Sequence, residues 1–77
     1  MTEKLNAYKN FCEREYKDFV RTIENGWDNP ISARNCGLQR CIGVADFLQI
    51  TENIPFDNTD KIYMEYRKKF YELEPKN

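Results

Sequence analysis

The segment NCGLQRCIGVADF, residues 35–47, decides the fold, because two cysteines and two glycines stand inside what otherwise has the pattern of one amphipathic helix. At about 100° per residue, the apolar and small side chains of residues 30–51 cover an arc of roughly 180° on such a helix. They are Ala33, Gly37, Leu38, Cys41, Ile42, Val44, Ala45 and Leu48, with Phe47 at the margin. A helix with so wide an apolar arc contacts more than one neighbour, so the sequence predicts a middle helix packed between others.

A second amphipathic segment precedes this middle helix. In residues 3–25 the apolar side chains recur at spacings of three and four, which predicts a helix with an apolar stripe roughly 120° wide. Gly26 follows, and glycine can take the left-handed conformation that ends a helix. Asn29 is the expected N-cap of the middle helix and Pro30 its first residue, where the missing N–H of proline costs nothing.

A third helix is expected over residues 58–73. Pro55 ends the middle helix near residue 51, because the residue before a proline is disfavoured in the helical conformation. Asp57 is then placed to cap the new helix. Three amphipathic helices joined by short connections bury their stripes by folding up and down, so we predict an all-α antiparallel three-helix bundle, with residues 1–77 as a single domain.

The charge, the hydropathy and the cysteine count of the chain argue against several classes of protein. Its 77 residues carry 12 Lys and Arg against 13 Asp and Glu, with the two signs interleaved. Such a surface exerts no general attraction on DNA, RNA or anionic lipid. No apolar run approaches the length of a membrane span, and the first residues lack an apolar leader. Three cysteines, an odd number, fit a reducing compartment, so we expect a cytoplasmic protein.

The cysteines do not match a metal or redox motif. Cys36 and Cys41 point about 140° apart on a helix, so their thiols cannot share a tetrahedral ion. The chain has no histidine, and Cys12 is the only other thiol. We therefore expect no metal, no cofactor and no small-molecule substrate.

An enzyme would have to depend on Cys36. Arg40 lies one helical turn away, and a neighbouring guanidinium can lower the pKa of a thiol. However, the chain lacks histidine, the commonest general base, and it has no glycine-rich phosphate loop. A free cysteine is more often a small buried apolar residue, so we predict no catalytic residue and no enzymatic activity.

Small side chains on the middle helix favour close packing instead. Gly37 and Cys41 lie one turn apart between Ala33 and Ala45, and such a ridge permits a short distance between helix axes. Glycine inside a helix costs about 1 kcal/mol relative to alanine, so a close contact is the economical explanation of Gly37. Gly43 projects near the polar border, where we expect a partner to approach.

Several side chains do not fit the predicted core and are candidates for partner binding. Phe11 lies about 60° beyond Tyr8 on the first helix. Met64 and Tyr71 line a second side of the third helix, with Arg67 between them. Aromatic residues, methionine and arginine are enriched at interfaces, although single exposed apolar side chains are also normal. The predicted contact residues are Phe11, Phe56, Met64, Arg67 and Tyr71, with Phe47 and Gly43 as second choices.

These observations favour a non-enzymatic protein–protein interaction domain. A core of this size rarely contributes more than about 3 to 5 kcal/mol to stability without disulfides, a metal or a partner subunit. We therefore expect that the interaction can be self-association as a homodimer. The role we predict is that of an accessory subunit or of a small stoichiometric inhibitor such as mobile genetic elements encode.

The alternative function is weak binding of nucleic acid by the third helix. Basic residues there are interleaved with tyrosines, a mixture that proteins use to bind single-stranded nucleic acid. They are Lys61, Tyr63, Tyr66, Arg67, Lys68, Lys69 and Tyr71. Acidic residues dilute this charge, and Glu65 is spaced to pair with Lys69 as on an ordinary solvated face. We therefore expect a protein partner or a second copy rather than nucleic acid.

Overall fold

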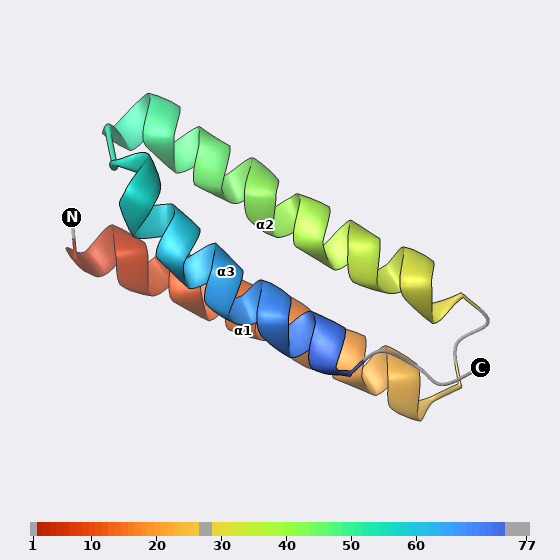
Figure 1. Cartoon of the computed structure of the whole chain (residues 1–77). Coiled ribbons are helices and arrows are strands. Elements are labelled where there is room, and N and C mark those ends of the chain that lie inside the picture. Colours follow the sequence, from red (N-terminus) through yellow and green to blue (C-terminus); the bar gives the residue numbers. More distant parts are fainter. Residues whose placement is uncertain (1, 27–28, 74–77) are drawn as a thin grey trace.

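The computed structural model describes residues 2–26 and 29–73, which form three helices: α1 at Thr2–Glu24, α2 at Pro30–Glu52 and α3 at Phe56–Glu72 (Figure 1). Consecutive helices run in opposite directions, and each helix packs against the other two. The rod that they form measures 41 × 16 × 15 Å. The predicted all-α three-helix bundle is therefore confirmed for the described residues.

The connection between α1 and α2 has the predicted local structure at both of its ends. Gly26 has a φ of 73°, the left-handed conformation expected after a helix. The side chain of Asn29 accepts a hydrogen bond of 3.1 Å from the backbone N–H of Ser32, and Pro30 is the first residue of α2. The bounds of α1 and α2 lie within one residue of those predicted.

The start of α3 differs from the prediction. The helix begins at Phe56, and its N-cap is Pro55, which makes no side-chain hydrogen bond, so Asp57 lies in the first turn and is not the cap. The physical reason is the turn before it. Asn53 adopts a left-handed φ of 55°, and the following Ile54 is buried in the core. Pro55 already has a φ compatible with a helix, so the chain enters α3 directly.

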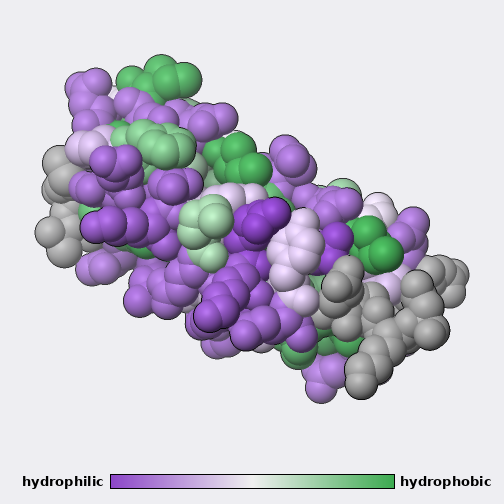
Figure 2. Space-filling view, in the orientation of Figure 1, coloured by the Kyte–Doolittle hydropathy of each residue, from purple (hydrophilic) through white to green (hydrophobic). Residues whose placement is uncertain are grey.

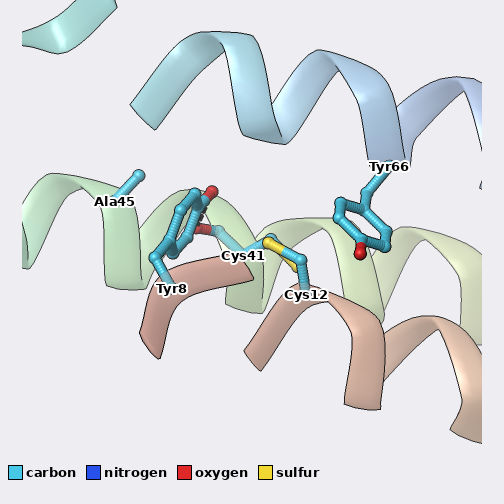
Figure 3. Packing of buried hydrophobic residues seen from close by; sticks show 5 residues of the cluster. All are labelled: Tyr8, Cys12, Cys41, Ala45 and Tyr66. Atoms are coloured by element: carbon cyan, nitrogen blue, oxygen red, sulfur yellow. Dashed lines mark hydrogen bonds between the residues drawn. The ribbon is translucent and has the colours of Figure 1, made fainter. Parts of the chain in front are cut away.

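Two clusters of buried side chains form the core, and each takes residues from all three helices. One cluster consists of Tyr8, Cys12, Cys41, Ala45 and Tyr66, all of which are drawn in Figure 3. The other consists of Phe19, Leu38 and Phe70. The predicted contact of α2 with more than one neighbour is confirmed, but α1 and α3 also pack against each other, so α2 does not lie between them.

Gly37 lies where α2 packs closely on Phe70 of α3. A Cβ atom added at Gly37 would lie 3.1 Å from Cε1 of Phe70, closer than an ordinary van der Waals contact. The ring of Phe70 is itself stacked on Phe19 of α1, with ring centroids 5.2 Å apart, so it has little freedom to move away. The close-packing interpretation of Gly37 is confirmed.

Candidate interaction surface

The outer side of α2 carries the most exposed large apolar side chains of the described residues. Ile50 is 80% exposed and Phe47 is 62% exposed. Gly43 and Cys36 are also exposed, and a Cβ atom built at Gly43 would meet nothing within 4 Å. These four residues, Cys36, Gly43, Phe47 and Ile50, are called the α2 outer face below. The prediction included Phe47 and Gly43 but missed Ile50, although its spacing from them follows the helical repeat.

Phe11 lies in a groove between α1 and α2. Its side chain is half-buried and packs against the cluster that contains Tyr8. Val44 and Leu48 of α2 line the same groove. Phe11 therefore belongs partly to the packing of the bundle, which explains its position away from the main apolar stripe of α1.

Tyr71 takes part in a stack that joins α3 to α2. The guanidinium carbons of Arg34 and Arg67 lie 4.1 Å and 4.6 Å from the centroid of the Tyr71 ring. Arg34 is buried, so this cation–π contact fixes the rotation of α2 against α3. Two of the predicted contact residues, Arg67 and Tyr71, are therefore used within the chain, and only part of the Tyr71 ring is exposed.

Phe56 and Met64 remain exposed on α3. Phe56 lies at a second groove, between α2 and α3, lined by Ile42, Ala45, Asp46, Gln49, Phe56, Thr59, Asp60 and Tyr63. Thr59 is fully buried there and accepts a hydrogen bond of 3.1 Å from the amide of Gln49. On the face shown in Figure 2, hydrophobic residues form separate patches divided by hydrophilic ones. The predicted contact residues are spread over different parts of the bundle, because Phe11 lies at the groove between α1 and α2 and Phe56 at the groove between α2 and α3.

Arg40, the guanidinium considered beside Cys36, forms a hydrogen bond with another group. Arg40 Nε donates a hydrogen bond of 2.6 Å to Oε1 of Glu15, a buried residue of α1. This hydrogen bond raises the pKa of Arg40. A second ion pair, between Lys4 and Glu52, also joins α1 to α2. Arg40 thus contributes to helix packing.

The other two thiols face each other inside the core (Figure 3). Cys12 of α1 and Cys41 of α2 are both buried. The hydrogen bond to Cys12, together with burial, raises the pKa of the Cys41 thiol. Side-chain hydrogen bonding with Cys41 lowers the pKa of the Cys12 thiol, against the effect of burial. Tyr8 also donates a hydrogen bond of 3.0 Å to the carbonyl of Cys41, which ties α1 to α2.

Within residues 2–26 and 29–73, no three or more His, Cys, Asp or Glu side chains are grouped so that they could hold a metal ion. Thiols in a dry core are shielded from substrates, so the mutual contact of Cys12 and Cys41 serves packing.

Two of the basic and aromatic residues of α3, Tyr66 and Lys69, make contacts within the bundle. Tyr66 is 2% exposed, and its hydroxyl donates a hydrogen bond of 2.7 Å to Glu13. The ammonium of Lys69 lies 4.7 Å from the centroid of the Tyr66 ring and 5.9 Å from that of Tyr16. A ring covered in this way offers no face on which a nucleic-acid base can stack.

No similarity to a known protein bears on the function of this chain, so the function proposed below is argued from its surface. None of the described helices is both long enough and apolar enough to cross a membrane. No protein-family model matches the chain, and neither the curated proteins nor the solved structures that were searched contain a match to it.

Proposed function

We propose that this chain is a non-enzymatic protein–protein interaction domain that binds its partner through the α2 outer face. The observation that carries the proposal is the exposure of Phe47 and Ile50 beside an unobstructed Gly43. Full burial of a phenylalanine or isoleucine side chain contributes about 1.5 to 3 kcal/mol, so a partner that covers both gains substantial binding free energy. Gly43 allows the backbone of that partner to come close.

Several features support a binding role over a catalytic one. The guanidinium of Arg40, one helical turn from the exposed Cys36, is hydrogen-bonded to Glu15, and the other two thiols are buried. Binding of nucleic acid by α3 has less support, because the Tyr66 ring is covered by Lys69. The domain acts as an accessory subunit or a small stoichiometric inhibitor. Its three free thiols support a reducing, cytoplasmic setting.

Photo-cross-linking in the cells that naturally produce the chain tests this function. A photoreactive phenylalanine analogue replaces Phe47 in one variant and Met64 in a matched control, because Met64 is also exposed but lies on α3. We expect a discrete cross-linked product from position 47 and much less from position 64. Equal labelling at both positions, or no product from position 47, would contradict the proposal.

A further inference from the structure

We propose that the partner of the α2 outer face is a second copy of this chain, bound so that the two α2 helices pair antiparallel about a two-fold axis at Gly43. The inference rests on the proposed function and adds to it the identity of the partner and the register of the contact.

The first support is the arrangement of the face. At about 100° per residue, Cys36, Gly43, Phe47 and Ile50 fall within an arc of roughly 60° on α2. Their positions fit the alternating three- and four-residue spacing by which two helices form a shared seam. In Figure 1, α2 lies to one side of α1 and α3, so its outer side is open to another helix.

The second support is that large and small side chains of the α2 outer face match those of a second copy. A two-fold axis through Gly43, perpendicular to the two helices, places this glycine against its own copy. Two helices can cross closely at such a point because neither has a side chain there. The same axis places the small Cys36 opposite the large Ile50 of the second copy, and this pairing occurs twice. A parallel pair would instead set Ile50 against Ile50 and leave a void between the two Cys36 side chains.

The third support is the chemistry of the two flanks of the seam. In an antiparallel pair, each flank faces the same flank of the second copy. Arg40 lies on one flank with Phe47, so its guanidinium meets the ring of the second copy's Phe47 in a cation–π contact. Glu15 contacts Arg40 through Nε, and the Arg40 side chain is 57% exposed, so part of the guanidinium faces solvent. On the other flank, the amide of Gln39 meets the carboxylate of the second copy's Asp46.

Disulfide trapping tests this register with the cysteines that the chain already has. In the Ile50→Cys variant, the new thiol would lie beside Cys36 of the second copy, and mild oxidation by oxidised glutathione would join them. Cys12 and Cys41 are buried and do not compete in the folded protein. We expect a covalent dimer from Ile50→Cys and little from the unmodified chain or from Met64→Cys, the control for random collision.

The double variant Cys36→Ser with Ile50→Cys separates the two possible directions. In the antiparallel pair its introduced thiols lie far apart, so we expect the covalent dimer to disappear. A dimer that persists in the double variant indicates parallel pairing and overturns the inference. If Ile50→Cys gives no dimer while position 47 cross-links to a different protein, this inference fails and the proposed function stands. If neither experiment gives a product, both fail.

Discussion

At the scale of single residues, two glycines of one helix differ in what surrounds them. Gly37 faces the Phe70 ring, where a Cβ atom would lie 3.1 Å from Cε1, whereas Gly43 has open space. The small-residue ridge in the sequence predicted the packing of Gly37. It could not predict the mutual contact of Cys12 and Cys41, because that contact depends on the rotation and axial register of two helices.

The two glycines give a matched pair of substitutions. Gly37→Leu should lower the free energy of unfolding by about 2 kcal/mol, because the larger side chain forces apart a filled contact with Phe70. Gly43→Leu should not destabilise the monomer, since leucine is the better helix former and meets no neighbour there. Urea denaturation at low micromolar concentration checks both variants. Equal stabilities for Gly37→Leu and the unmodified chain would contradict the packing account.

Tyr8 should make the stability of the domain depend on alkaline pH. Burial raises the pKa of the Tyr8 phenol in the folded chain, whereas an unfolded tyrosine ionises at about pH 10. Above that pH the unfolded chain releases a proton that the folded chain keeps, so the free energy of unfolding falls as the pH rises.

The Tyr8→Phe variant isolates this contribution. At neutral pH it should be less stable by about 1 kcal/mol, because the hydrogen bond to the Cys41 carbonyl is lost. Between about pH 9 and pH 11 it should lose less stability than the unmodified chain. Denaturation curves measured across this range test the difference, and parallel pH profiles for the two proteins would rule out the role given to Tyr8.

At the scale of helices, the sequence predicts periodic segments well and their contacts less well. Spacings of three and four residues are enough to place α1 and α2 within one residue. The earlier start of α3 follows from burial of Ile54, a tertiary effect that overrides the capping preference of Asp57. The cation–π contact of Tyr71 with Arg34 was also beyond prediction, because it joins residues of different helices.

The turn between α2 and α3 offers a test at this scale. Asn53 has a φ of 55°, which asparagine and glycine tolerate better than other residues. Asn53→Ala should lower the free energy of unfolding by about 1 kcal/mol, whereas Asn53→Gly should keep the turn and most of the stability. Thermal melts of the two variants give the comparison. Equal melting temperatures for the alanine and glycine variants would contradict the role given to the left-handed conformation of Asn53.

At the scale of the whole molecule, the chain has a slender core and an uncovered apolar face on its middle helix. The bundle is only 16 × 15 Å across, so much of each helix remains near solvent. Pairing of the α2 outer faces would bury Phe47 and Ile50 from both copies and would enlarge the apolar interior. On this account, the middle helix packs against α1 and α3 on one side and against a second copy on the other.

Dimer formation should make thermal stability depend on protein concentration. Because only folded chains present the α2 outer face, association draws the equilibrium away from the unfolded state. The melting temperature of the unmodified chain should therefore rise with concentration. In Phe47→Glu the dependence should vanish, whereas Met64→Glu should retain it. Circular dichroism melts over a wide concentration range measure the effect, and melting temperatures that never change with concentration would count against the dimer.

Sedimentation equilibrium of the unmodified chain beside Gly43→Leu tests the central claim most directly. The chain has a mass of 9.3 kDa, so the account predicts that its apparent mass approaches twice this value as the concentration rises toward the millimolar range. Gly43→Leu should remain at 9.3 kDa while keeping its helical circular dichroism, because the added side chain blocks only the approach of the second copy. A purely monomeric unmodified chain, or equal association of both proteins, would contradict the account.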